Sequence, residues 1–201
     1  MREWVFRWRG YVLIPSAVLV VVLCHPTLKS FLWGLGVALL GEALRCWGVG
    51  YSGTTTRESR VIAPRLVTAG PYAHVRNPLY LGNFITALGF LVVGSGGIDW
   101  SLRLMLGAII VVSYATVYGI IIPLEEEYLA GMFGEEYREY LQHVPRLLPR
   151  LTPYEKRQGT FHWSVIGSAE IHTLALFTMI AGILFGKMVM DMRVWEIILR
   201  G

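Results

Sequence analysis

Residues 102–123 read LRLMLGAIIVVSYATVYGIIIP, and Arg103 is the only charged residue in this stretch. A helix that spans a bilayer needs about 20 predominantly apolar residues, so the stretch is long enough to cross a membrane. Four further apolar runs lie at residues 11–24, 31–49, 80–94 and 165–190. The sequence therefore predicts an all-α, multi-pass transmembrane bundle of about five spans, two of them short.

The composition of the whole chain agrees with this prediction. Of the 201 residues, 54% are hydrophobic and 16% are charged, and the mean hydropathy is +0.51. Soluble domains carry about 25% charged residues, so the chain is too apolar for that class. Arginines precede the first apolar run as they would in a signal peptide, but no small-residue cleavage site follows it. We therefore expect this run to be a span.

Loop charge predicts the orientation, because Lys and Arg concentrate in cytoplasmic connections. With the N-terminus inside, the cytoplasmic side receives Arg2, Arg7, Arg9, Arg57, Arg60, Arg65, Arg76, Arg138, Arg146, Arg150, Lys156 and Arg157. The opposite side receives Lys29, Arg103, Lys187, Arg193 and Arg200. Both long polar connections, 50–79 and 125–163, then lie on one cytoplasmic face, where we expect the active site.

No metal site is expected from the sequence. Cys24 and Cys46 lie in or beside apolar runs, where a free thiol acts as a small hydrophobe. Glu170 and His172 open the last apolar run, but their spacing is not the i, i+4 pair of a helical zinc site. We therefore interpret His172 as an interfacial residue.

The first polar connection enters the third apolar run through LVTAGPYAHVRNPLYLG, residues 66–82, after the hydroxyl-rich Thr54-Thr55-Thr56. Turn-forming glycines and prolines, two tyrosines, an imidazole and an amide gather where the chain enters lipid. Irregular backbone at membrane depth is tolerated only when it is buried in protein or lines a cavity. The stretch is thus either a shaped turn with interfacial tyrosines or a ligand site.

The second polar connection follows the fourth apolar run. It is expected to begin as a helix at Leu124, with the acidic residues 125–127 in a first turn that favours negative charge, although Pro123 could instead mark a kink. A second helical piece is predicted over residues 135–144, before Pro145. The acidic side chains either are solvated or bind a cationic group.

Ordered motifs run through both connections: Gly-Pro-Tyr at 70–72, Val-Arg-Asn-Pro-x-Tyr-x-Gly at 75–82, Glu-Glu-x-x-Leu at 125–129, Phe-Gly-x-x-Tyr at 133–137, and Val-Pro-Arg at 144–146. Their order resembles the superfamily of membrane methyltransferases that includes the isoprenylcysteine carboxyl methyltransferases and the phospholipid N-methyltransferases. The resemblance covers residues 66–149, the motif-bearing core of a single domain over 1–201. Residues 164–201 are expected to add a C-terminal span that packs beside the core or mediates self-association.

The resemblance implies S-adenosylmethionine in a cytoplasm-facing pocket and a lipid acceptor that enters from the bilayer. The cofactor contacts that it implies are Arg65, Leu66, Val67, Tyr72, Asn77, Pro78, Leu79, Tyr80, Glu125 and Glu126. Aromatic rings and a carboxylate suit a sulfonium. Arg45 and Arg146 are candidates for substrate binding, although Arg45 is expected first to pair with Glu42, three residues earlier.

Asn77 bears on the acceptor. The isoprenylcysteine enzymes carry His at this place and an arginine one turn before the glutamate pair, where this chain has residues 120–123 without one. Phospholipid methyltransferases tend to have Asn-Pro, which favours a phospholipid amine. An amide does not take up a proton near neutral pH, so the catalytic base stays open, with His74 and Glu126 as candidates.

The predicted function is S-adenosylmethionine-dependent methyl transfer to a membrane lipid or lipid-anchored acceptor. Carboxyl methylation of a prenylated cysteine is the main alternative. A reductase related to the sterol reductases would need more spans than this chain offers. A non-catalytic membrane scaffold or carrier is the alternative from another class. The expected partners are the lipid bilayer and a substrate that is either a membrane lipid or a lipidated molecule. No nucleic-acid partner is expected.

Overall fold

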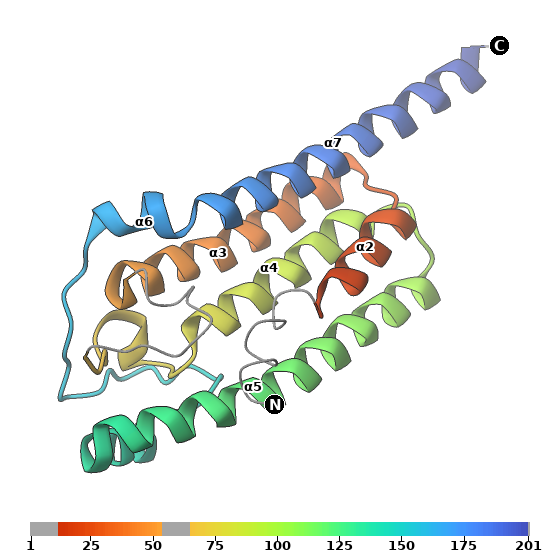
Figure 1. Ribbon diagram of the computed structural model, residues 1–201. Coiled ribbons are helices and arrows are strands. Elements are labelled where there is room, and N and C mark those ends of the chain that lie inside the picture. Colours follow the sequence, from red (N-terminus) through yellow and green to blue (C-terminus); the bar gives the residue numbers. More distant parts are fainter. Residues whose placement is uncertain (1–11, 54–64, 201) are drawn as a thin grey trace.

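The computed structural model of the protein describes residues 12–53 and 65–200, with side chains described as far as Met192. The described regular elements are all helical, namely α2 (Ile14–Leu23), α3 (Leu28–Ser52), the 3-10 helix η2 (Gly70–Ala73), α4 (Pro78–Gly94), α5 (Trp100–His143), α6 (Trp163–Ala169) and α7 (Ile171–Arg200). This confirms the all-α prediction (Figure 1). Some residues used in the sequence argument lie outside the described ones: Arg2, Arg7, Arg9, Tyr11, Thr54, Thr55, Thr56, Arg57 and Arg60, together with the side chains of Arg193 and Arg200.

All the apolar runs form helices, and their lengths differ. Three helices are long and apolar enough to cross a membrane: Leu28–Ser52, Trp100–His143 and Ile171–Met192. Two shorter apolar helices cover Ile14–Leu23 and Pro78–Gly94. A helix rises about 1.5 Å per residue, so ten residues cover roughly half of a hydrocarbon core about 30 Å thick. The protein is multi-pass, while a total of five crossings and their orientation stay predictions.

Helices α3 and α4 form the tightest pair of the bundle and lie side by side along their length (Figure 1). Glycines make this approach possible: a Cβ on Gly34 would lie 2.2 Å from the backbone nitrogen of Val93, and one on Gly89 would lie 2.3 Å from that of Ala38. Small residues let membrane helices bring their backbones together. The pair consequently fixes polar side chains of α3 against α4.

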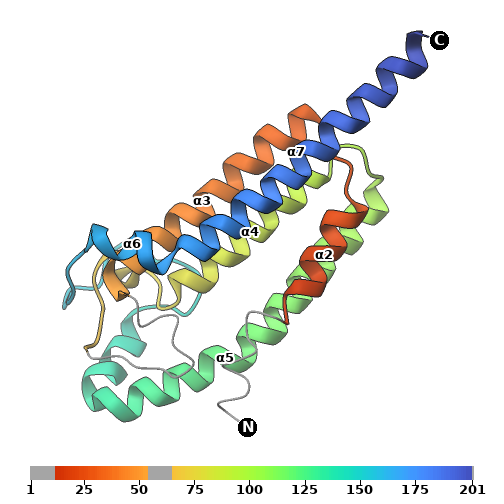
Figure 2. The same cartoon turned by 45° about the horizontal axis from the view of Figure 1, so that its top comes forward.

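Two apolar clusters attach the remaining helices. Helix α7 packs against the start of α3 and the end of α4 through Phe31, Phe90, Leu184 and Met188, and Figure 2 shows it running along that pair. Helices α2, α4 and α5 meet through a second cluster that includes Val20, Leu106 and Ile110. The long α5 therefore runs along the α2 and α4 side of the bundle (Figure 1).

The expected helix start at Leu124 is wrong. Helix α5 continues through Pro123 into the acidic stretch, because a proline removes one backbone hydrogen bond without ending every helix in which it occurs. The break comes at Gly134, whose φ of 56° and ψ of −128° suit a residue without a Cβ. The second helical piece after this break is confirmed, and it ends at His143.

The last apolar run is divided where the sequence predicts one continuous span. Helix α6 ends at Ala169 and α7 begins at Ile171, so Glu170 occupies the break between them. Glu170 is 1% exposed. The break therefore places a carboxylate inside the bundle.

Candidate active site

The two polar connections meet at one end of the bundle, as predicted. The segment 144–162, which we call the strap, returns from α5 and forms backbone hydrogen bonds with residues 68–76. Their N···O distances are 2.9 Å for Arg76 to Pro145, 3.0 Å for Arg150 to His74, 2.8 Å for Tyr154 to Ala73 and 2.9 Å for Thr68 to Gln158. The motif-bearing segments consequently share one framework.

The Gly-Pro-Tyr motif is a tightly held turn. Gly70 has a φ of 61°, and a Cβ there would come within 2.2 Å of the Tyr51 ring. The backbone nitrogens of His74 and Val75 both donate to the carbonyl oxygen of Pro71 at 3.0 Å. The Tyr140 hydroxyl donates to the carbonyl oxygen of Tyr72 at 2.7 Å. Glycine is therefore required, and the turn fixes the backbone of Tyr72.

The Tyr72 side chain lies between two charged groups. Burial raises the pKa of its hydroxyl to about 12; a hydrogen bond with Ser52 lowers it, the charge of Glu125 raises it and the charge of Arg45 lowers it. The phenol therefore stays neutral at physiological pH. Its hydroxyl is within electrostatic reach of both Glu125 and Arg45.

Tyr80 and Glu125 bring the motifs of residues 75–82 and 125–129 into contact. The Tyr80 hydroxyl donates to Glu125 Oε1 at 2.6 Å. The Tyr80 ring lies 4.6 Å from the ring of Tyr118, which lies 5.2 Å from that of Tyr114. Aromatic faces and a carboxylate together attract a desolvated cation. These residues fit the sulfonium of S-adenosylmethionine.

Glu126 has a different environment from that of its neighbour. It is 9% exposed, and its Oε1 lies 3.2 Å from Arg76 Nη1 and 3.2 Å from Arg146 Nε. Arg146 Nη2 also donates to Oε2, and this hydrogen bonding raises the pKa of the Arg146 guanidinium. Glu126 and Arg146, predicted as cofactor and substrate residues, therefore pair with each other and join α5 to both polar connections.

His74 and Asn77 also hold the strap. His74 Nδ1 lies 2.9 Å from the carbonyl oxygen of Arg150, so it donates and leaves Nε2 without a proton in the neutral ring. Asn77 Nδ2 donates to the carbonyl oxygen of Arg146 at 3.1 Å. The two polar side chains thus stabilise the connection between motif segments.

The remaining predicted cofactor residues are distributed around this framework. Leu66 is buried against Tyr137, Tyr140, Val144 and Tyr154. Val67 lies beside Gly159 of the strap, and Arg65 is exposed. Pro78 begins α4, and Leu79 packs over Gly48 of α3. The structure therefore brings all of them to the same end of the bundle, with apolar packing for Leu66 and Leu79.

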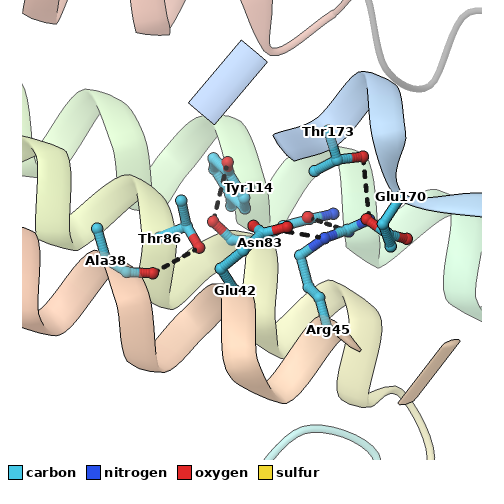
Figure 3. A network of polar contacts seen from close by, with 8 residues as sticks. All are labelled: Ala38, Glu42, Arg45, Asn83, Thr86, Tyr114, Glu170 and Thr173. Carbon is cyan, nitrogen blue, oxygen red and sulfur yellow. Dashed lines mark hydrogen bonds and ion pairs between the residues drawn. The ribbon is translucent and has the colours of Figure 1, made fainter. Parts of the chain in front are cut away.

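A second polar cluster lies inside the bundle, among α3, α4, α5 and the α6–α7 break (Figure 3). Arg45 Nη2 donates to Glu170 Oε2 at 2.8 Å and to Oε1 at 3.0 Å. Arg45 Nε lies 3.8 Å from Glu42 Oε2, so the predicted pair within α3 exists but is the more distant one. Arg45 Nη1 also donates to Asn83 Oδ1. We call Glu42, Arg45, Asn83 and Glu170 the interior cluster.

The sequence predicts two of the four members of the interior cluster, Glu42 and Arg45, and misses Asn83 and Glu170. The sequence places Glu170 at the start of the last apolar run without assigning it a partner, whereas in the structure it is the closest acidic partner of Arg45. The available indication was a carboxylate in an apolar run, since such groups usually face the bundle interior and pair there. Asn83 and the tyrosines of α5 carried no indication beyond their polarity.

An apolar pocket of about 490 Å³ borders the interior cluster. Its walls come from α3 and from the segment 161–166, and its lining residues are Ala43, Cys46, Trp47, Tyr51, Phe161, Trp163 and Ile166. Cys46 lies one helical turn after Glu42, and Ile166 one turn before Glu170. Within the described part of the chain, no group of three or more His, Cys, Asp or Glu side chains is placed to hold a metal ion.

Comparison with known proteins agrees with the resemblance to membrane methyltransferases. Residues 5–136 match the phospholipid methyltransferase family. The chain is 31% identical over 140 residues to protein-S-isoprenylcysteine O-methyltransferase B of Arabidopsis thaliana, covering 64% of this chain and 66% of that protein.

Two bacterial relatives match shorter regions. Identity to the cobalt-zinc-cadmium resistance protein CzcN of Cupriavidus metallidurans is 35% over 100 residues, covering 50% of this chain and 41% of the relative. Identity to methanethiol S-methyltransferase 1 of Bradyrhizobium diazoefficiens is 38% over 88 residues, covering 43% of this chain and 27% of the relative. The chain thus spans less than half the length of these two relatives.

Proposed function

Because this chain belongs to the phospholipid methyltransferase family, within the superfamily of membrane methyltransferases that includes the isoprenylcysteine enzymes, we propose that it methylates a lipid acceptor. Homologues in this superfamily use S-adenosylmethionine, which supplies an electrophilic methyl group on a sulfonium. The observation that carries the proposal is the hydrogen bond between Tyr80 and Glu125, at 2.6 Å. This bond joins the motif of residues 75–82 to the motif of residues 125–129, beside the aromatic rings of α5.

The side chains at this point have complementary roles. Glu125 supplies negative charge to the sulfonium, and the hydrogen bond from Tyr80 holds its carboxylate in place. The Tyr80 and Tyr118 rings, 4.6 Å apart, offer faces to the same positive group. Methyl transfer is an in-line displacement, in which a lone pair of the acceptor atom bonds the methyl carbon while the bond to sulfur breaks and S-adenosylhomocysteine leaves. An amine acceptor must therefore first release a proton, which the solvent accepts. Holding the acceptor atom and the methyl carbon close together supplies most of the acceleration.

We propose a phospholipid amine as the acceptor. Asn77 supports it, because the resemblance associates Asn-Pro with phospholipid methyltransferases. Carboxyl methylation of a prenylated cysteine is the second candidate, supported by the 31% identity to an isoprenylcysteine O-methyltransferase. His74 and Glu126, the two candidates for a catalytic base, are better suited to holding the strap and the arginines they contact.

Methyl transfer in a defined membrane tests the proposal. The purified chain in nanodiscs is supplied with radiolabelled S-adenosylmethionine and offered either phosphatidylethanolamine or a farnesylated cysteine. We expect label in the phospholipid. Label in the farnesylcysteine alone would replace the first candidate by the second, and label in neither would contradict both acceptors.

Cofactor binding is tested separately with S-adenosylhomocysteine by calorimetric titration. We expect saturable binding in nanodiscs. Absence of binding in both detergent and nanodiscs would favour the scaffold or carrier alternative over an enzyme.

A further inference from the structure

The interior cluster contains more negative than positive charge. Arg45 brings one guanidinium, while Glu42 and Glu170 bring two carboxylates, so the fully ionised group has a net charge of −1. Arg45 Nη2 donates to both carboxylate oxygens of Glu170, at 2.8 Å to Oε2 and 3.0 Å to Oε1. Glu42 comes no closer to the guanidinium than 3.8 Å. The two carboxylates therefore share one guanidinium, and Glu170 makes the closer contacts with it.

Glu42 lacks hydrogen-bond donors. It is 5% exposed, and neither of its carboxylate oxygens accepts a hydrogen bond from any residue that the structure describes. Buried carboxylates are normally paired and hydrogen-bonded, because an ionised group without partners is costly in a low-dielectric interior. Glu42 has the guanidinium of Arg45 at 3.8 Å but lacks a hydrogen-bond donor among the described residues, and a group with N–H donors would supply it.

The cluster adjoins the proposed cofactor residues. Asn83, which accepts from Arg45, lies three residues after Tyr80 on α4, a rise of about 4.5 Å along the helix. The Tyr114 hydroxyl donates to the carbonyl oxygen of Asn83 at 3.3 Å, and the Tyr114 ring packs on Tyr118, the neighbour of Tyr80. The charge of Arg45 also influences Tyr72. The cluster and the cofactor residues thus form one continuous polar region.

The apolar pocket lies one helical turn from the interior cluster on two helices. It is lined by Cys46 and Ile166, which lie one turn from Glu42 and Glu170, and by the exposed indoles of Trp47 and Trp163. Indole rings favour the level of lipid headgroups. A lipid with its apolar part in this pocket would have its polar group beside the interior cluster.

We propose that Glu42, with Arg45 and Glu170 held as a pair behind it, binds the ammonium group of the acceptor lipid. The inference rests on the proposed function and extends it, because it assigns the amine of the acceptor to a site in the interior cluster. An ammonium supplies the N–H donors that Glu42 lacks and a second positive charge for the two carboxylates of the cluster. Glu170 and α7 lie beyond the residues that match the family.

Lipid retention tests this site directly. The wild-type protein is incorporated into nanodiscs with equal amounts of phosphatidylethanolamine and phosphatidylglycerol, and bound lipids are identified by native mass spectrometry. Both lipids carry a phosphate, so a difference between them reports the ammonium. We expect the wild type to prefer phosphatidylethanolamine and Glu42→Gln to lose about tenfold of that preference, the magnitude of a hydrogen bond to a charged group.

Matched controls separate this role from a structural one. Glu135→Gln removes a highly exposed carboxylate and should keep the preference. Glu42→Gln should bind S-adenosylhomocysteine as the wild type does and melt at no lower temperature, because glutamine removes a buried charge and leaves the pair of Arg45 and Glu170 intact. A lower melting temperature together with weaker cofactor binding would mean that Glu42 is structural and would overturn the inference.

The remaining outcomes decide between the ammonium site and the proposed acceptor. An unchanged lipid preference in Glu42→Gln, or no preference in the wild type, would overturn the ammonium site. A wild-type preference that depends on Glu42, without methyl transfer to phosphatidylethanolamine, would support the site and contradict the proposed acceptor. The two failures are therefore distinguishable.

Discussion

The proposed cofactor region around Tyr80 and Glu125 and the interior cluster around Arg45 both pair a carboxylate with polar side chains, but they are assembled differently. Tyr80 and Glu125 belong to motifs within the segment that matches the family. The interior cluster depends on Glu170, which is supplied from the α6–α7 break. The difference indicates that the Tyr80–Glu125 contact lies within the family-matched segment, whereas the interior cluster is completed by the C-terminal helices.

The largest expected effect comes from removing the guanidinium of the interior cluster. Arg45→Met leaves two buried carboxylates without their cation and should reduce the free energy of unfolding by about 3–5 kcal/mol. Thermal melting in detergent measures it. Arg138→Met, which removes an exposed arginine of α5, is the matched control. A melting temperature equal to that of the control would mean that the cluster adds little to stability.

Glu125→Gln should instead affect the cofactor region. Because the neutral amide gives up the attraction to a sulfonium, affinity for S-adenosylmethionine should fall by about tenfold or more, with a melting temperature close to that of the wild type. Titration with S-adenosylmethionine and, in parallel, with the neutral S-adenosylhomocysteine measures it. Equal losses for both ligands would argue against a role for the charge.

Tyr80→Phe should have a smaller effect on the same region. It removes the hydroxyl that donates to Glu125 at 2.6 Å but keeps the ring. We expect a loss of about 1 kcal/mol in cofactor binding, which is the net value of a typical hydrogen bond, because the hydroxyl acts on the sulfonium only through Glu125. Tyr80→Leu, which also removes the ring, should cost more, and an equal cost for the two variants would exclude a contribution from the ring.

The last effect is absent at neutral pH and is expected only at alkaline pH. Tyr72 has a pKa of about 12 in the folded protein, above the value near 10 of an unfolded chain. The unfolded state therefore loses its proton first, and the stability that Tyr72 contributes below pH 10 is lost as pH rises from about 10 to 12. Melting temperatures across this range should fall less steeply for Tyr72→Phe than for the wild type. Parallel curves would contradict the burial of this hydroxyl.

The interior cluster shows why part of the site could not be predicted. The sequence placed Glu42 and Arg45 one helical turn apart, which local geometry alone determines. It did not indicate that Arg45 bonds more closely to Glu170, since that contact depends on how α7 packs on α3. Glu126 is similar, because its two arginine partners come from separate connections.

The sequence by itself determined the helical membrane architecture, the family and the grouping of both polar connections at one end. These properties depend on apolar run length and motif order, which are local along the chain. The tertiary structure decided that α5 continues through Pro123, that Glu170 interrupts the last run, and that Glu42 is left without a hydrogen-bond donor among the described residues. These depend on contacts between distant segments, where close packing of α3 on α4 and the cost of buried charge select the arrangement.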